Sequence, residues 1–199
     1  KGLDELDLST GSRLSGNSRT EESACLSRIK KQSMPMGAVL KNRRRAMEQL
    51  KAIWRTKDIR AAVDTVLMRN DTSLLVDLLG VMNGKSSLWN LDLCVLLLPE
   101  IRQLLAVDGK RAVYSETAGQ SLRVLLDACG TAIRHGLKRT PSIGTDVERE
   151  ARMEKCKRCM QELLAIRQLV AEKQKLNESS SAVGKTYKEI GIVLQLLDS

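Results

Sequence analysis

Two cysteines three residues apart are the clearest candidates for chemistry in this sequence. Cys156 and Cys159 form a C-x-x-C pair, which is the spacing of half a zinc site. A closed zinc site needs four ligands, but the sequence has no second C-x-x-C and only one histidine, His135. A redox C-x-x-C usually opens a helix after a strand, whereas this pair falls within a long helical pattern. We therefore expect two packed thiols, with metal binding as the less favoured alternative, and we predict neither a metal nor a cofactor.

Catalytic and nucleotide-binding motifs form the second class of chemistry to consider. Neither the G-x-x-x-x-G-K-[ST] loop nor the G-x-G-x-x-G turn occurs, so no nucleotide site is predicted. His135 has no obvious nucleophile as a partner, and its place near a predicted helix end favours a capping or dipole role. The carboxylates follow no motif. The sequence therefore predicts a protein without catalytic residues, and not an enzyme.

Positive charge is the other feature that indicates a function, because it could attract a binding partner. The net charge is +9, from 33 Lys and Arg residues against 24 Asp and Glu residues. Residues 39–60 hold eight basic and two acidic side chains, and residues 134–175 hold eleven and six, whereas residues 61–133 have a net charge of −2. Such a distribution favours an acidic partner: nucleic acid, an anionic membrane surface or an acidic protein tail.

The first basic region combines charge with an apolar helical stripe. An apolar stripe of Leu40, Met47, Leu50 and Trp54 predicts a helix face that is buried. Five basic residues fall mostly off this stripe: Arg43, Arg44, Arg45, Lys51 and Arg55. They predict a basic face opposite the apolar one, and an ordinary solvated face is the alternative interpretation. With only four aromatic residues in the chain, stacking of single-stranded nucleic acid is disfavoured, although duplex binding through phosphates stays open.

The elements that must position these residues are predicted to be helices. Hydrophobic residues make up 42% of the chain, aromatic residues only 2%, and Phe is absent, which suits helices better than sandwiches or barrels. Residues 1–33 are rich in Ser, Gly, Arg and acidic residues without a periodic apolar face, so we expect a disordered linker or tail. Residues 34–199 are expected to form one helical domain. Because the first residue is Lys, we expect a fragment of a longer protein.

Apolar stripes at helical spacing recur along this domain and predict an all-α array of about seven helices. Asp71 is a predicted helix cap, Asn83-Gly84 a break, and Ser86 or Ser87 the cap of a fourth helix that kinks or breaks near Pro99. Thr145-x-x-Glu148 is a capping box that opens a long helix from about Asp146 to Leu176. Other predicted core positions are Ile59, Ala62, Val63, Val66, Leu67, Leu122, Leu125, Leu126, Ile133, Tyr187, Ile190, Val193 and Leu194.

A membrane association is not predicted. The longest apolar stretch, Leu88–Leu98, has 11 residues and contains Asp92, so it indicates a buried helix rather than a span. Five cysteines are an odd number at low density, which is typical of reduced thiols.

Longer sequence motifs resemble a known family. The motifs are W-x3-D-I at Trp54–Ile59, N-D-x-S-L-x2-D-L-L at Asn70–Leu79, S-L-W-x-L-D-L-C-x3-L-P at Ser87–Pro99, P-S-I-G-x-D at Pro141–Asp146 and E-R-E-x-R-x-E-K-C-x-x-C at Glu148–Cys159. Over residues 39–198 the sequence resembles the conserved C-terminal domain of the regulatory, WD-repeat subunit of katanin, the microtubule-severing ATPase. A paralogue without the propeller that carries the same domain is equally compatible with these motifs.

This resemblance implies a non-catalytic, regulatory function. In katanin the domain pairs with the N-terminal helical domain of the catalytic AAA ATPase subunit, contributes to microtubule binding and tunes severing. The surface of the pair also receives short peptides from spindle-pole and minus-end proteins. The resemblance further implies a cytoplasmic location on the cytoskeleton, at microtubules, the centrosome and the spindle pole.

Two sets of candidate site residues follow from charge, apolarity and the resemblance together. Candidates for contact with the acidic tails of tubulin are Arg43, Arg44, Arg45, Lys51, Arg55, Arg152, Lys155 and Arg158. Candidates for contact with the catalytic subunit are Trp54, Trp89, Leu88 and Leu91, although tryptophans on apolar stripes are more often core residues. Each exposed charge contact contributes only ~0–1 kcal/mol, so several must act together. A basic helical domain that binds nucleic acid is the alternative function.

Overall fold

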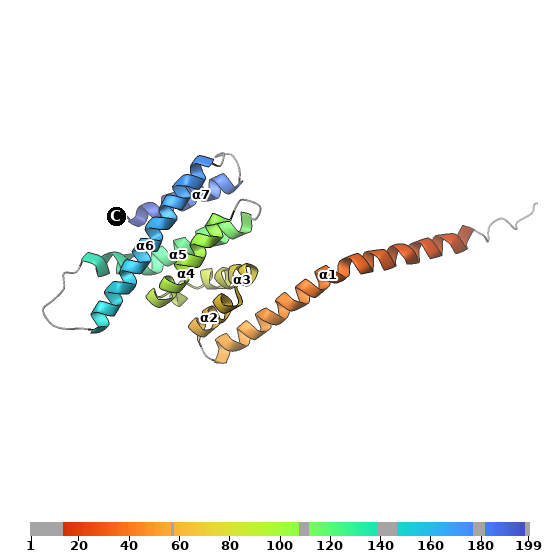
Figure 1. Cartoon of the computed structure of the whole chain (residues 1–199), viewed down its shortest axis with the longest axis horizontal. Coiled ribbons are helices and arrows are strands. Elements are labelled where there is room, and N and C mark those ends of the chain that lie inside the picture. Colours follow the sequence, from red (N-terminus) through yellow and green to blue (C-terminus); the bar gives the residue numbers. More distant parts are fainter. Residues whose placement is uncertain (1–13, 57, 108–111, 139–146, 177–181, 198–199) are drawn as a thin grey trace, which may run out of the picture. The chain divides into compact units, whose positions relative to one another are not determined.

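The computed structural model describes residues 14–56, 58–107, 112–138, 147–176 and 182–197 (Figure 1). Within these ranges the chain forms seven α-helices and two short 3₁₀ helices, and no strand. The elements are α1 (Leu14–Thr56), α2 (Ile59–Arg69), α3 (Thr72–Asn83), η2 (Ser86–Leu88), α4 (Leu91–Ala106), α5 (Ala112–Lys138), α6 (Val147–Leu176), α7 (Ala182–Leu194) and η3 (Gln195–Leu197). The predicted all-α fold of about seven helices is confirmed.

The chain divides into two compact units, residues 1–49 and residues 50–199. The described part of the first unit, residues 14–49, lies entirely in α1. Composition predicted a disordered linker or tail for residues 1–33, and this stays a prediction; the structure describes helix from Leu14 onwards, through Pro35. Every side chain from Glu21 to Met36 is exposed. A helix needs backbone hydrogen bonds but no buried face, so the absence of an apolar core pattern did not exclude one. Residues 1–13 lie outside the described ranges.

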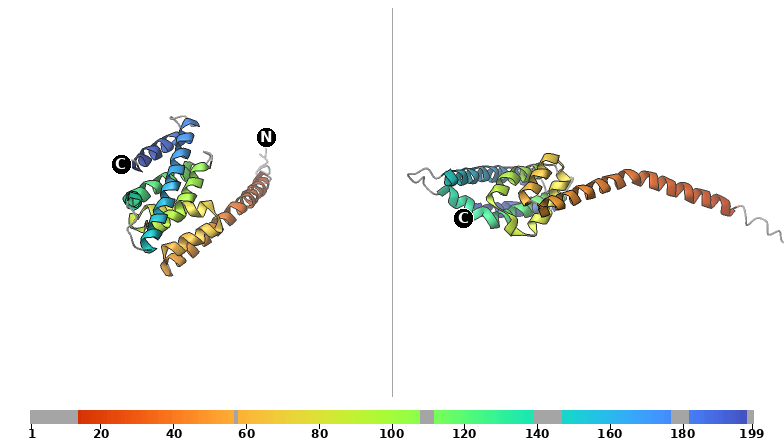
Figure 2. Two further views of the ribbon diagram at one scale, coloured as in Figure 1. Left: turned by 60° about the vertical axis from the view of Figure 1, so that its left-hand side comes forward. Right: turned by 90° about the horizontal axis from the view of Figure 1, so that it is seen from below.

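The second unit is built around α5. This helix packs against α3, α4, α6 and α7, and α6 also packs against α4 and α7 (Figures 1 and 2). The predicted core residues Leu122, Leu125 and Ile133 of α5 are fully buried at these contacts. Full burial of such side chains stabilises a fold by about 1.5–3 kcal/mol each. Four neighbours around one helix therefore account for why α5 holds the array together.

Side-chain caps begin the short helices. Asp58 accepts a hydrogen bond from the Ala61 N–H at 2.7 Å, and the predicted cap Asp71 accepts from Ser73 and Leu74 at 3.0 and 3.2 Å. Asn70 ends α2 in the left-handed conformation, with φ of 50°. These contacts satisfy donors that a helix N-terminus leaves without an intrahelical partner, and they fix the sharp corner between α2 and α3.

The predicted cap of α4 is wrong, and of the predicted kink or break near Pro99 the break does not occur. Ser86 lies in η2, and the cap of α4 is Asn90, whose side chain accepts from the Leu93 N–H at 2.9 Å. Asparagine caps helices as well as serine does, and burial of Trp89 just before it sets the helix start there. No break occurs at Pro99, because the buried Leu97 and Leu98 keep the helix packed despite the missing N–H.

The later elements follow the sequence pattern closely. Asn83 ends α3 before Gly84, and α6 runs as one helix from Val147 to Leu176, as predicted. Thr145 of the predicted capping box and the loop at 139–146 lie outside the described residues. None of the helices in the described part combines the length and apolarity that a membrane crossing requires.

Candidate protein-binding site

An exposed apolar seam runs along α1 in the first unit. Leu26, Ile29, Met36 and Leu40 are all exposed, and we call these four residues the α1 seam. Steps of three, seven and four residues place them on one side of a helix, at heptad spacing. Ser33 occupies the remaining position of this repeat. The seam therefore has the spacing by which one helix packs against another.

Exposure of the large apolar side chains of the α1 seam to water is energetically unfavourable. Single exposed apolar residues are ordinary on protein surfaces, but several large ones at heptad spacing on one helix face are typical of a binding surface. Amphipathic helices that pack into a partner present anchors at this spacing. The first unit thus has an exposed apolar surface of the kind that binds another polypeptide.

Basic side chains surround the seam. Between residues 23 and 47 the sequence contains no Asp or Glu. The same stretch carries seven basic residues: Arg28, Lys30, Lys31, Lys41, Arg43, Arg44 and Arg45. A second copy packed on this seam would bring like charges together, which is destabilising, whereas an acidic partner would be attracted. Charge therefore favours an acidic helical partner.

The predicted basic face of α1 is exposed. Arg43, Arg44 and Arg45 lie at the surface of the first unit, and Lys51 and Arg55 lie at the surface of the second. Arg44 donates to Glu48 at 2.9 Å one turn away. Such an exposed pair contributes little to stability, so Arg44 can exchange this partner for another carboxylate.

The predicted basic residues of α6 differ in their surroundings. Arg152 is exposed, and Arg158 forms an ion pair with Glu154 at 3.3 Å on the same helix. Lys155 instead reaches Asp92 of α4 at 2.5 Å. Its hydrogen bond is the main cause that lowers the pKa of the Asp92 carboxyl. Lys155 therefore joins α6 to α4, and it is less available to an outside partner than Arg152.

The four predicted partner-contact residues lie deeper than the basic ones. Trp54, Leu88 and Leu91 are half-buried, so part of each side chain can be reached. Trp89 is only 5% exposed, and its indole Nε1 has no hydrogen-bond partner within the structure. Trp89 is therefore a core residue of the second unit, with almost no surface left for a direct contact.

Comparison with known proteins decides the family. Residues 31–194 match the con80 domain of katanin. The chain belongs to the katanin con80 family. Katanin p80 WD40 repeat-containing subunit B1 of Xenopus tropicalis and its counterpart in Gallus gallus are each 32% identical over 197 residues, which is 99% of this chain. The Danio rerio counterpart is 30% identical over the same length.

The chain corresponds to a part of these relatives. It spans 29% of the length of the frog and chicken proteins and 28% of the zebrafish protein. The con80 match begins at residue 31, so it includes Met36 and Leu40 of the α1 seam as well as the second unit. The identity to the full-length relatives reaches further, over nearly all of this chain.

Four cysteines of the con80 domain come together where α4, α5 and α6 pack. Cys94, Cys129, Cys156 and Cys159 are all buried, and the neighbouring Cys129 is the main cause that raises the pKa of the Cys94 thiol. Burial, followed by the neighbouring Cys156 and Cys129, raises the pKa of the Cys159 thiol to about 12. Among the described residues, no group of three or more His, Cys, Asp or Glu side chains has an arrangement that could hold a metal ion. Burial of both side chains and the raised pKa of each thiol favour packed, protonated thiols in the C-x-x-C pair.

The apolar seam was missed by sequence reasoning. Leu26 and Ile29 fall in the stretch assigned to a tail, and Met36 was not included in the predicted stripe that begins at Leu40. The signal that could have found them is the heptad spacing, which continues from the predicted stripe towards the N-terminus. Polar residues at Ser33 and Arg43 interrupt it.

Proposed function

We propose that this chain is a non-catalytic regulatory and targeting module of a katanin. It pairs with the N-terminal domain of the catalytic AAA ATPase subunit, contributes to microtubule binding and modulates severing. Membership of the con80 family supports the regulatory assignment. The exposed α1 seam supports pairing with another polypeptide, and it is the observation that carries the proposal.

Burial of the seam would supply the free energy of pairing. Leu26, Ile29, Met36 and Leu40 are each more than half exposed in the chain alone. Removing apolar surface from water contributes about 25 cal/mol per Å², and this term is not screened by salt. The surrounding basic side chains add attraction to an acidic partner, chiefly as a faster association. Pairing should therefore survive high salt, while its rate should fall.

Two methionines provide a matched test of the pairing. Met36 lies on the seam and is 63% exposed, whereas Met34 is 65% exposed and lies two residues away, on the other side of the helix. We expect Met36→Asp to abolish co-elution with the catalytic subunit's N-terminal domain at about 0.5 M salt, because a buried unpaired carboxylate is costly. Met34→Asp should co-elute like the parent. Equal effects of both variants would contradict the seam as the interface.

Microtubule binding is proposed to depend on the exposed basic residues. Charge reversal of Arg43, Arg44 and Arg45 to Glu should weaken co-sedimentation with microtubules, and added salt should weaken it further. The matched control reverses Arg28, Lys30 and Lys31 on the same helix. A specific basic face predicts a larger loss for the first triple variant. Equal losses would indicate a general attraction of the +9 chain to the acidic tails of tubulin.

Nucleic-acid binding is the alternative that the same assay addresses. All four aromatic side chains are buried or half-buried, namely Trp54, Trp89, Tyr114 and Tyr187. They offer no exposed platform for base stacking, which disfavours single strands. Tighter binding to duplex DNA or RNA than to microtubules at physiological salt would favour the alternative.

We propose a cytoplasmic location at microtubules, centrosomes and spindle poles, where peptides of spindle-pole or minus-end proteins are further partners.

A further inference from the structure

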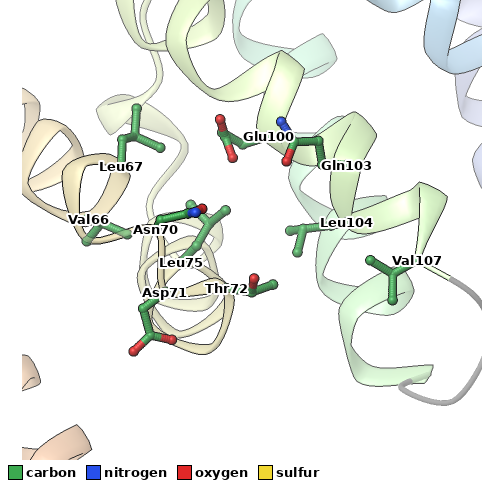
Figure 3. Close-up of a pocket in the computed structure, with 10 residues that line it drawn as sticks. All are labelled: Val66, Leu67, Asn70, Asp71, Thr72, Leu75, Glu100, Gln103, Leu104 and Val107. Atoms are coloured by element: carbon green, nitrogen blue, oxygen red, sulfur yellow. The ribbon is translucent and has the colours of Figure 1, made fainter.

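A pocket of about 150 Å³ lies between the α2–α3 corner and the C-terminal half of α4 (Figure 3). It belongs wholly to the second unit. Its floor is apolar, because Val66, Leu75 and Leu104 line it and are buried. Leu67 and Val107 continue the apolar lining towards the surface. The pocket therefore accepts an apolar chain that enters from solvent.

The walls of this pocket are polar. Asn70 and Thr72 extend from the α2–α3 corner towards Glu100 and Gln103 of α4 (Figure 3). Within the described part of the chain, none of these four side chains has a hydrogen-bond partner. Asp71 points away from the pocket, and its carboxylate accepts the backbone N–H groups that start α3.

The four polar groups share one chemical property, which is an oxygen acceptor. Glu100 supplies a carboxylate, Asn70 and Gln103 supply amide oxygens, and Thr72 supplies a hydroxyl. Among the described residues that line the pocket there is no Lys or Arg. A ligand that satisfies all four needs several N–H donors and a positive charge at one end, and an apolar stem that reaches the floor.

An arginine side chain has this combination. Its guanidinium carries five donors and a permanent charge, and its three methylenes are apolar. A bare metal ion would leave the apolar floor uncovered and, among the described lining residues, would find one carboxylate directed into the pocket, that of Glu100. We propose that this pocket binds an arginine side chain, which an exposed, extended segment of a partner polypeptide presents.

The corner that carries two of the acceptors is rigid before binding. Asn70 has a left-handed backbone, and its N–H donates to the Leu67 carbonyl at 3.1 Å. Asp71 caps α3 directly after it, which fixes the position of Thr72. On the other wall, Glu100 and Gln103 lie one turn apart on α4. Little ordering is then needed on binding, which favours recognition of a single side chain.

A titration of the full chain with short peptides tests this site without any katanin subunit. The probe is a blocked pentapeptide with a central arginine between glycines, followed by ¹H–¹⁵N correlation spectra. We expect shifts confined to residues 66–75 and 100–107, with a Kd on the order of millimolar, as suits one anchored side chain. The citrulline peptide, which has the same shape without the charge, should bind about tenfold more weakly.

Other outcomes of this titration would overturn the proposal. Equal shifts with arginine and citrulline would show that charge is not recognised, and shifts centred on other residues would place the site elsewhere. Stronger binding of the lysine peptide would exclude arginine as the ligand. Shifts at these residues that depend on protein concentration alone, with a dimer in sedimentation, would show that a second copy occupies the pocket.

A pair of variants ties the binding to the pocket. Glu100→Gln retains the shape of the side chain and should weaken the arginine peptide about five- to tenfold. The control is Glu116→Gln, because Glu116 is an exposed glutamate of α5 outside the pocket. Unchanged affinity in Glu100→Gln, with an intact spectrum, would contradict the proposal. Since no pairing partner is present, either result leaves the proposed pairing through α1 to its own test.

Discussion

Among single side chains, Tyr187 has the clearest energetic role. It is buried in α7, and its hydroxyl donates a hydrogen bond to the Leu105 carbonyl at 2.8 Å. Leu105 lies in the last turn of α4, where carbonyls have no partner within the helix. Tyr187→Phe should therefore leave a buried carbonyl without a donor and lower the free energy of unfolding by about 1–3 kcal/mol. Urea denaturation of the two proteins measures this difference.

Tyr114 provides the control for this prediction. Its hydroxyl lies 3.2 Å from the Ser73 hydroxyl, and the site is only partly buried. Water can replace such a partner, so Tyr114→Phe should cost clearly less than Tyr187→Phe. Equal losses in the two variants would show that ring packing, and not the hydrogen bond to α4, determines the effect.

The thiol of Cys159 makes the free energy of unfolding depend on pH in the alkaline range. Burial raises its pKa from an ordinary 9.0 to about 12. Above about pH 9 the unfolded chain releases this proton while the folded chain retains it, so the folded state binds more protons. The free energy of unfolding should therefore fall as pH rises from about 9 towards 12.

The measurement compares urea unfolding of the parent and of Cys159→Ala at about pH 8 and about pH 10.5. The variant lacks this proton, so the difference in stability between the two proteins should narrow at the higher pH. Cys25→Ala, a change at an exposed cysteine, should retain the parent's pH dependence. If the difference in free energy of unfolding between the parent and Cys159→Ala stayed constant with pH, the raised pKa of Cys159 would be contradicted.

Packing between α5 and α6 depends on a glycine. A Cβ atom added at Gly136 would lie 2.5 Å from Cys156 Sγ and 3.2 Å from its Cβ. These distances are far below van der Waals contact, so the two helices would have to separate. Gly136→Ala should lower the free energy of unfolding by about 1–3 kcal/mol, as overpacking of a core does, despite the better helix propensity of Ala. Thermal or urea denaturation of the parent and of Gly136→Ala measures this loss of stability.

Gly80 of α3 is the matched control for this helix contact. It is exposed, and a Cβ there would meet nothing within 4 Å. Gly80→Ala should raise stability by roughly 0.5–1 kcal/mol, because Ala loses less backbone entropy in a helix. If both glycine variants were stabilised, α5 and α6 could not be in such close contact at Gly136.

Helix stripes could be predicted from the sequence wherever tertiary contacts bury one face. The stripes of α5 and α7 gave their cores correctly, because the apolar spacing directly records the buried side. The start of α1 could not be found in this way, since Glu21 to Met36 have no buried face to record. The cap of α4 was misplaced because Ser86, Ser87 and Asn90 are all competent caps, and packing of Trp89 decides among them.

The candidate sites were predictable only in part. Exposure of Arg43, Arg44 and Arg45 follows from their spacing relative to the apolar stripe. The pairing of Lys155 with Asp92 does not, because it joins residues of two helices that only the fold brings together. The same holds for the pocket, whose walls come from residues 70–75 and 100–107. Such cross-element contacts carry no local signal in one sequence.

The two units of the molecule differ in burial: side chains 21–36 of the first unit are all exposed, whereas the second unit has a densely packed core. An isolated helix is only marginally stable in water, whereas the buried amides of α4 and α5 open only when the second unit unfolds. In hydrogen-exchange mass spectrometry of the chain alone, we expect amides of residues 21–45 to exchange within seconds. Amides around Leu97 and Leu122, whose side chains are fully buried, should be protected by orders of magnitude more.

Hydrogen exchange in the presence of the katanin catalytic subunit's N-terminal domain tests whether that domain binds the α1 seam. If that domain covers the α1 seam, exchange of residues 21–45 should slow markedly, because burial of Ile29 and Met36 couples helix opening to dissociation. Protection around Leu97 and Leu122 should change little. Met36→Asp should remove the slowing, while Met34→Asp should retain it. Strong protection of residues 21–45 in the chain alone would contradict the arrangement, since it would require that the seam is already buried, by the chain itself or by a second copy.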